Sequence, residues 1–205
     1  MKEIFLQDIN KVYDICKNLK NEEETFEIRY KKKYDYNGEI LYSEEKIFYI
    51  KNDSIPKTYK SKIRDVKFGK NCVVVEPSNL YECILDDNVF VGPFCEIQKG
   101  VKIGKNTRIQ SHSFICELVT IGKNCFIGHG VMFINDLFKE GKPAGDSKLW
   151  KKTIIEDNVS IGSNATILPV KICSNVVIGA GSVVTKDILE SGIYAGNPAK
   201  KIRSL

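Results

Sequence analysis

The sequence predicts an all-β chain built around a parallel β-helix of hexapeptide repeats, with a small α+β appendage at its N-terminus. Apolar residues recur at every sixth position, and the residue four positions after each of them is small or branched, from Val89 to Val131. In such repeats each hexapeptide forms one short strand and a turn, and the stacked coils bury one continuous core. Nine apolar residues carry the pattern at six-residue intervals: Leu85, Val91, Ile97, Ile103, Ile109, Ile115, Ile121, Ile127 and Phe133.

The repeat is interrupted once and shortened twice. Between Phe133 and Ile155 the chain is much longer than one repeat, so residues 136–151 are expected to leave the coil as an excursion loop. Loops longer than about 12–15 residues are usually functional or disordered. The spacing is one residue short before Ile172 and before Leu85, so a tightened turn is expected at both places.

Residues 1–62 follow a different pattern and form the predicted appendage, while residues 63–205 form the β-helix domain. Positions 7–20 have the apolar spacing of an amphipathic helix. Two alternating segments flank Asn37-Gly38, and because both turn residues tolerate positive φ, the pattern predicts a β-hairpin. Residues 52–60 are typical of a linker.

The composition argues against several classes of protein. The net charge of +5 arises from 31 basic and 26 acidic residues that are mostly interleaved, which indicates a mixed surface and no nucleic-acid partner. The N-terminus lacks the apolar core of a signal peptide, and no run approaches the roughly 20 apolar residues of a membrane span, so we expect a cytoplasmic protein without a membrane partner.

Seven cysteines without a C-x-x-C pair indicate reduced thiols. Two histidines cannot supply a three-histidine zinc site, so no metal is expected.

Polar residues gather around the start of the excursion. Glu117 and Asn135 are separated by one coil of three hexapeptides, and the repeats that contain His112 and His129 also begin one coil apart. Residues one coil apart stack at strand separation, about 4.8 Å. We therefore expect the polar groups of residues 112–136 to converge on one patch. His129 is the candidate base, because an imidazole with an unperturbed pKa of about 6.5 suits proton transfer near neutral pH.

Several segments together resemble the left-handed β-helix hexapeptide acyltransferases. The more specific ones are "QSHSF" (110–114) and "GHGVMFIND" (128–136), while "IGAGSVVTKD" and "GNPAK" are general to these enzymes. Over residues 66–205 the chain is most similar to the N-acetyltransferases that act on nucleotide-linked 3-amino-3,6-dideoxyhexoses. The resemblance implies a left-handed helix of three flat sheets, a homotrimer, and acetyl-CoA and the amino sugar bound between subunits.

The resemblance also implies roles for individual residues. Asn135 and Asp136 would position the sugar amine, with Asp136 accepting one of its hydrogen bonds. Amide formation needs a neutral amine held against the thioester carbonyl, a stabilised oxyanion and a destination for a proton. The departing CoA thiolate can take that proton, so catalysis by His129 and catalysis without a side-chain base both stay open. Glu117 and His112 are candidate substrate-binding residues.

Acetyl-CoA is the expected co-substrate. Backbone groups near Gly162 and Ala180 would line its pantetheine arm, and Lys200 and Arg203 would meet its phosphates. Cysteines at the small-residue position of the repeat, such as Cys125, are expected to pack in the core and not to act as nucleophiles.

The expected function is transfer of an acetyl group from acetyl-CoA to the C3 amine of a dTDP-linked 3-amino-3,6-dideoxyhexose, for a surface glycan such as lipopolysaccharide O-antigen or an S-layer glycan. Open alternatives within enzymes are a UDP-linked sugar, a 4-amino sugar, another acyl group or another small acceptor. The non-enzymatic alternative is a β-helical scaffold, which would not need "HGVMFIND" followed by a long loop.

Overall fold

The computed structural model describes residues 3–6, 27–36, 39–47 and 62–205. The chain forms two compact units, Met1–Tyr59 and Lys60–Leu205, and each is described by itself. The predicted helix 7–20 and the predicted linker 52–60 lie outside the described residues.

The first unit contains a three-stranded sheet. Strand β2 (Glu27–Tyr36) pairs antiparallel with β3 (Glu39–Ile47), and Tyr36 lies opposite Glu39, as predicted for a hairpin that turns at residues 37–38. Strand β1 (Glu3–Leu6) lies parallel to β2, a pairing that the sequence pattern does not predict.

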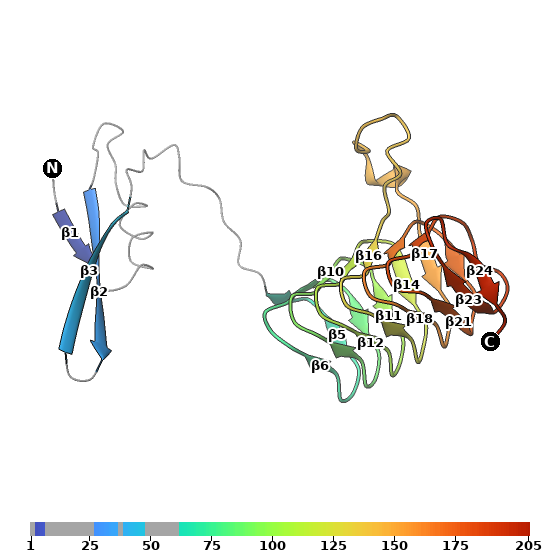
Figure 1. The fold of residues 1–205 in the computed structure, drawn as a ribbon, viewed down its shortest axis with the longest axis horizontal. Helices are drawn as coiled ribbons and strands as arrows, with labels where there is room; N and C mark the ends of the chain where they lie inside the picture. Colours follow the sequence, from blue (N-terminus) through green and yellow to red (C-terminus); the bar gives the residue numbers. More distant parts are fainter. Residues whose placement is uncertain (1–2, 7–26, 37–38, 48–61) are drawn as a thin grey trace. The chain divides into compact units, whose positions relative to one another are not determined.

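The second unit is a left-handed parallel β-helix whose short strands form three sheets (Figure 1). The seven-stranded sheet contains β4 (Ile63–Arg64), β7 (Asn79–Tyr81), β10 (Glu96–Ile97), β13 (Phe114–Ile115), β16 (Met132–Phe133), β19 (Thr166–Ile167) and β22 (Val183–Val184). The six-stranded sheet contains β5 (Lys67–Phe68), β8 (Ile84–Leu85), β11 (Lys102–Ile103), β14 (Val119–Ile121), β17 (Thr153–Ile155) and β20 (Lys171–Ile172). The eight-stranded sheet contains β6 (Val73–Val74), β9 (Phe90–Val91), β12 (Arg108–Ile109), β15 (Phe126–Ile127), β18 (Ser160–Ile161), β21 (Val176–Ile178), β23 (Gly192–Ala195) and β24 (Lys200–Arg203).

Strand pairing confirms the predicted register. Ile109 pairs with Ile127, as expected for three hexapeptides per coil. Ile155 pairs with Ile172, one residue short of three hexapeptides, so the tightened turn is present there. Ile121 pairs with Ile155, so the excursion is inserted within a single coil and the repeat resumes in the same frame after it.

The repeat residues form the core. All nine apolar residues of the hexapeptide pattern are at most 2% exposed, and the small residues four positions later are buried with them. Two of these small residues are polar and bond the neighbouring coil: the Thr107 hydroxyl donates to the carbonyl of Gly122 at 2.8 Å, and the Ser113 hydroxyl to that of Gly128 at 2.9 Å. Satisfied hydroxyls of this kind can be buried without the cost of an unpaired polar group.

The chain turns three corners in each coil, and we name each corner after its residues. The excursion corner joins the seven- to the six-stranded sheet, at residues 65–66, 82–83, 98–101, 116–118, 134–152 and 168–170. The asparagine corner joins the six- to the eight-stranded sheet, at residues 69–72, 86–89, 104–107, 122–125, 156–159 and 173–175. The histidine corner joins the eight- to the seven-stranded sheet, at residues 75–78, 92–95, 110–113, 128–131, 162–165 and 179–182.

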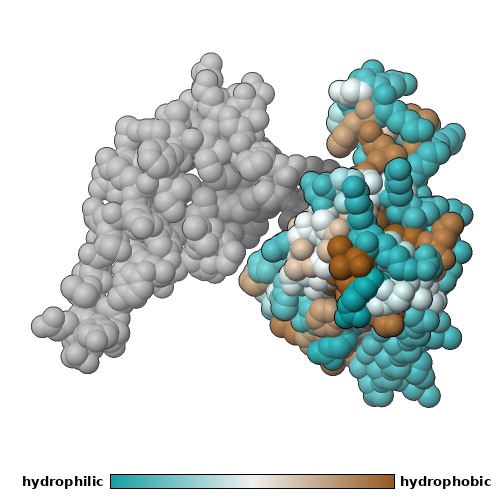
Figure 2. All heavy atoms as spheres, turned by 45° about the vertical axis from the view of Figure 1, so that its right-hand side comes forward, coloured by the Kyte–Doolittle hydropathy of each residue, from teal (hydrophilic) through white to brown (hydrophobic). Residues whose placement is uncertain are grey.

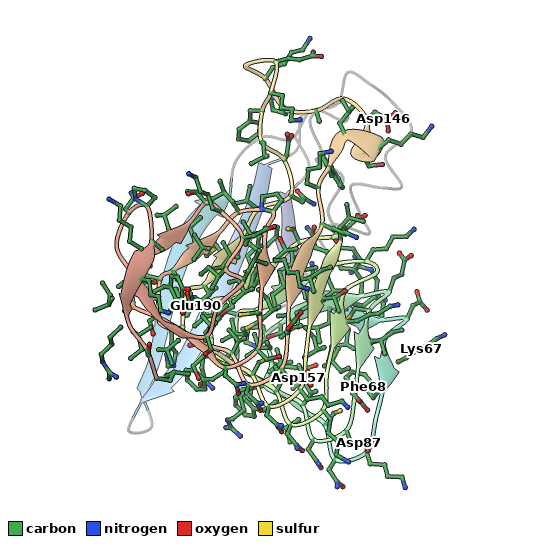
Figure 3. The ribbon with its side chains drawn as sticks, turned by 90° about the vertical axis from the view of Figure 1, so that its right-hand side faces the viewer. Lys67, Phe68, Asp87, Asp146, Asp157 and Glu190 are labelled. Atoms are coloured by element: carbon green, nitrogen blue, oxygen red, sulfur yellow. The ribbon has the colours of Figure 1, made fainter. Side chains whose placement is uncertain are left out.

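Six asparagines from Asn71 to Asn175 form a side-chain ladder along the asparagine corner. Each amide bonds the next one, at 2.9 to 3.3 Å, and each asparagine has positive φ. Asparagine tolerates this left-handed conformation better than most residues, so one residue type satisfies both the turn and the stack. In Figure 3, Asp87 and Asp157 mark this corner, on the side of the coils away from Asp146.

The excursion projects from the coils between β16 and β17 (Figure 1). It contains the short 3-10 helix η2 (Ser147–Leu149), for which the Asp146 side chain is the N-cap. Among the described residues, no helix has the length and apolar character needed to cross a membrane.

Candidate functional site

Asn135 lies at the excursion corner and is partly buried. Its side-chain amide donates a hydrogen bond to the backbone carbonyl of Glu117, one coil away, at 3.3 Å. Its own carbonyl accepts from the backbone N–H of Lys151 at 2.9 Å, which closes the base of the excursion. Asn135 is thereby fixed to the coils on one side and to the far end of the loop on the other.

Asp136 organises the loop from within. One carboxylate oxygen accepts from the backbone N–H of Phe138 at 2.9 Å, and the other accepts from that of Ala144 at 2.7 Å. Asp and Asn commonly start turns in this way. Each carboxylate oxygen has a second lone pair, so Asp136 can still accept a hydrogen bond from a ligand.

Glu117 stands beside other polar groups of the seven-stranded sheet. Its backbone N–H donates to the side-chain oxygen of Gln98 at 3.3 Å, and the Gln98 amide donates to Glu96 at 2.8 Å. Burial raises the pKa of the Tyr81 phenol, and the negative charges of Glu96 and Glu117 raise it further. Tyr81 is therefore a neutral hydrogen-bonding group near the carboxylate of Glu117.

His112 is exposed at the histidine corner and stacks on Phe94 of the preceding coil. The ring centroids are 4.9 Å apart and the planes differ by 18°. Both residues have positive φ, at a turn position where the later coils have Gly130, Asn164 and Gly181. A left-handed conformation is costly for a residue with a side chain, so this exposed aromatic pair departs from the pattern of the corner. Phe94 is a residue that the sequence reasoning missed, although its place in the repeat could have indicated it.

His129 is also exposed at the histidine corner, next to the residues expected to line the pantetheine arm. Its carbonyl accepts from the backbone N–H of Asn164 at 2.8 Å, so the turn at Gly162 lies directly on the turn at His129. A Cβ added to Gly162 would lie 2.4 Å from the backbone nitrogen of Ala180, so only glycine allows these turns to stack so closely. The structure thus brings His129, Gly162 and Ala180 together on one corner.

The two histidines and the Glu117–Asn135 pair lie on different corners. The histidine corner precedes β13 and β16, whereas the excursion corner follows them. Roughly 15–20 Å of chain therefore separates His129 from Asn135. The expectation that the polar groups of residues 112–136 converge on one patch is wrong for a single chain, because each side of the triangular coil takes one whole hexapeptide.

Lys200 and Arg203 lie on β24, which pairs antiparallel with β23 at the end of the eight-stranded sheet. Both side chains are exposed. The Arg203 guanidinium donates to the carbonyl of Ser204 at 3.0 Å, and Lys200 lies opposite Ala195. They share a sheet with the strands that lead into the histidine corner, and no hydrogen bond links either side chain to His129 within the described residues.

The excursion encloses a pocket that the sequence reasoning missed. Its volume is about 180 Å³, and Asp136 forms part of its wall. Four lysines also line it: Lys139, Lys142, Lys148 and Lys151. The loop has no repeat, so spacing could not place these side chains around one cavity.

The buried cysteines are poorly suited to nucleophilic chemistry. Burial raises the pKa of the Cys116 thiol to about 12 and that of the Cys83 thiol to about 11. Burial also raises the pKa of Cys95 and Cys125. Only the thiolate is an effective nucleophile, so these thiols are inert at neutral pH. Among the described residues, no cluster of three metal-ligating side chains occurs.

Comparison with known families accounts for most of the β-helix. Residues 82–117 match the family described as bacterial transferase hexapeptide (six repeats), and residues 118–132 and 152–186 match the hexapeptide repeat of succinyl-transferase. The β-helix of the chain is therefore similar to the hexapeptide repeats of these transferases. The interval between the last two matches corresponds to the excursion.

Individual relatives agree with this assignment. The bifunctional protein GlmU of Thermosipho africanus is 34% identical over 154 residues, which is 66% of this chain and 32% of GlmU, so the chain spans about a third of the length of that relative. A hexapeptide-repeat acetyltransferase of Vibrio cholerae, crystallised with acetyl-coenzyme A, is 28% identical with a TM-score of 0.52, over 61% of this chain and 72% of that one. AntD, an N-acyltransferase from Bacillus cereus crystallised with dTDP and coenzyme A, shares the fold at 23% identity, with a TM-score of 0.56 over 66% of this chain and 84% of AntD.

Proposed function

We propose that the chain is an acetyl-CoA-dependent N-acetyltransferase that acts on the C3 amine of a dTDP-linked 3-amino-3,6-dideoxyhexose. The observation that carries the proposal is the geometry at the start of the excursion. Asn135 is fixed to the coil by its bond to Glu117, and Asp136 stands at the wall of the loop pocket. The acetyl-CoA complex of the 28% identical Vibrio cholerae protein supports acetyl-CoA as the co-substrate.

The reaction forms one bond and breaks one. The neutral amine attacks the thioester carbonyl, the new C–N bond forms, the C–S bond breaks, and the amine loses a proton to the CoA thiolate or to His129. A free lone pair of Asp136 accepts one N–H of the amine and orients the nitrogen lone pair toward the carbonyl. Holding two reactants in this way can supply about 7–11 kcal/mol of a barrier in well-oriented systems.

A homotrimer with sites between subunits accommodates the two separate corners. The histidine corner of one subunit would supply His129 and the pantetheine-binding turns at Gly162 and Ala180, with Lys200 and Arg203 available to the CoA phosphates. The excursion corner of the next subunit would supply Asn135 and Asp136. Because His129 and Asn135 lie on different corners of one chain, such an interface would bring both residues to the same reacting atoms.

The choice of nucleotide and amine is supported by the sequence resemblance. Relatives acting on uridine-linked amino uronates tend to depart from Asn-Asp after the "MF" dipeptide, whereas this chain keeps Asn135 and Asp136. The product would be an N-acetylated sugar nucleotide, made in the cytoplasm for a surface glycan such as O-antigen or an S-layer glycan. Residues 1–62 would form a separate appendage and residues 63–205 the catalytic domain.

Release of free CoA thiol from acetyl-CoA tests the proposal. The full chain is assayed with thymidine- and uridine-linked 3-amino and 4-amino sugars, and the product mass is checked. Turnover that is fastest with a thymidine-linked 3-amino-6-deoxyhexose is expected. Turnover with only a uridine-linked or 4-amino sugar would favour the other acceptor classes, and absence of both turnover and acetyl-CoA binding would favour a β-helical scaffold.

A further inference from the structure

The pocket inside the excursion carries an excess of positive charge. Four lysines and two acidic residues line it. Figure 2 shows the excursion as a projection whose surface carries both hydrophilic and hydrophobic residues. The wall residues used below are Asp136, Lys139, Glu140, Lys142, Lys148 and Lys151.

The two acidic residues of the wall offset only part of the charge of the four lysines. Both oxygens of Asp136 accept loop N–H groups, and Glu140 lies 4.0 Å from Lys142. Three lysines, Lys139, Lys148 and Lys151, have no carboxylate within 4.0 Å in the part of the chain that the structure describes. Several ammonium groups around one concave space favour an anion with more than one charged oxygen.

We propose that this lysine-lined pocket binds the pyrophosphate of the nucleotide-linked amino sugar. The inference rests on the proposed function and deepens it, because it names the part of the substrate that the excursion holds. At about 180 Å³, the pocket is smaller than the about 300–1,000 Å³ of sites that enclose whole ligands. It therefore takes one group of a larger molecule.

The position of Asp136 decides which phosphate is bound. In a 3-amino hexose joined to a nucleotide, the pyrophosphate is attached at C1 and the amine at C3, two carbons away on the same ring. A carboxylate that holds the amine must therefore lie close to the pyrophosphate. In acetyl-CoA the whole pantetheine arm separates the thioester from the phosphates, so the CoA phosphates cannot reach a pocket whose wall contains Asp136 while the thioester faces the amine.

Binding of inorganic pyrophosphate to the full chain tests the pocket independently of turnover. The test variant replaces Lys139 and Lys148 by alanine, and the matched control replaces Lys152 and Lys123, two exposed lysines outside the pocket wall, so that the net charge is the same. Calorimetric titration at low ionic strength should show the dissociation constant raised about tenfold or more in the test variant, since each lost lysine removes a charge-assisted hydrogen bond to the anion. The control should stay within about twofold of the parent. Equal affinity for pyrophosphate in all three proteins, or no binding by the parent chain, would overturn the proposal.

Steady-state kinetics identify the source of the phosphate. The test variant should show a raised KM for the nucleotide-linked sugar and an unchanged KM for acetyl-CoA, and replacing the same lysines by arginine should restore most of the affinity. A raised KM for acetyl-CoA alone would overturn the assignment to the sugar.

If pyrophosphate binds through these lysines but no nucleotide-linked amino sugar is acetylated, the proposed function fails and the assignment of the pocket to that substrate falls with it. If acetylation occurs and neither KM depends on the lysines, the proposed function stands and the pocket assignment fails.

Discussion

The amide of Asn135 donates to the backbone carbonyl of Glu117 in the coil beside it, with the two atoms 3.3 Å apart. This bond ties the first residue of an aperiodic loop to a coil whose strands and core are regular. The next residue, Asp136, then sets the shape of the loop through its bonds to the N–H groups of Phe138 and Ala144. Sites built on rigid elements hold their geometry better than sites built on loops alone, and this pair joins both kinds of element.

Replacing either residue of the pair should abolish turnover, but with different effects on the loop. Asn135→Ala and Asp136→Ala should each lower kcat about 100-fold or more, the scale seen when one positioned group that stabilises a transition state is lost. In Asp136→Ala the amides of Phe138 and Ala144 should also lose protection from hydrogen exchange, whereas in Asn135→Ala they should keep it. Both variants should stay folded, because the core residues are untouched. Turnover near the parental rate in either variant would remove the site assignment.

Mixing two inactive variants should restore activity if the site lies between subunits. His129→Ala removes a group of the histidine corner, and Asn135→Ala removes one of the excursion corner. Mixed trimers then contain some interfaces with both original residues, so the refolded mixture should turn over substrate while each pure variant does not. The measurement is the rate of the mixture against that of each variant alone. A mixture as inactive as its components would indicate a site within one subunit, and an active His129→Ala protein would show that His129 is not the base.

The buried cysteines should resist alkylation in the folded chain. With the pKa of Cys116 raised to about 12 and that of Cys83 to about 11, almost no thiolate is present at pH 8. Mass spectrometry after treatment with iodoacetamide should show modification of the half-buried Cys72 and Cys173 before that of the buried thiols. In urea all should react at similar rates. Rapid loss of activity through Cys116 would instead indicate a nucleophilic thiol.

The ion pair between Glu156 and Lys171 should stabilise the coils over a defined pH range. Lys171 Nζ lies 2.9 Å from a Glu156 oxygen, and this hydrogen bond, with one from the backbone of Ser174, holds the pKa of Glu156 below its ordinary value. Because the pKa of Glu156 is lower in the folded chain than in the unfolded chain, its charged form stabilises the fold. This stabilisation is fully present at pH values above the ordinary pKa of about 4.3, and it is lost as the pH falls through the lowered pKa of the folded chain. The hydrogen bond from Lys171 to Glu156 raises the pKa of Lys171. The stabilisation that the charged Lys171 contributes is therefore fully present below pH about 10.4, and it is lost as the pH rises through the raised pKa.

Thermal unfolding of Glu156→Gln at several pH values tests this ion pair. The variant should melt below the parent at pH 7, and the difference should shrink as the pH falls below about 4, where the parental carboxylate is protonated as well. A difference that is constant from pH 7 to pH 3 would show that the charge of Glu156 contributes nothing.

Periodicity made the fold predictable, because every sixth residue must be apolar for stacked coils to share one core. The same counting located the shortened turn before Ile172 and the length of the excursion. Counting residues could not place the polar side chains correctly. A spacing of one coil shows which positions stack, but it does not show that His112 and Glu117 lie at opposite ends of one strand segment. The lysine-lined pocket depends on the bonds that Asp136 makes inside the loop, and an aperiodic loop gives no spacing from which to infer them.

The most direct measurement is the rate of CoA thiol release from acetyl-CoA with a thymidine-linked 3-amino-3,6-dideoxyhexose, with the product mass recorded. We predict rapid release, a mass increase of one acetyl group on the sugar amine, and loss of both in Asn135→Ala. If the full chain neither binds acetyl-CoA nor releases its thiol with any amino-sugar nucleotide, the excursion is a structural projection of a β-helical scaffold and the proposed acetyltransferase activity is wrong.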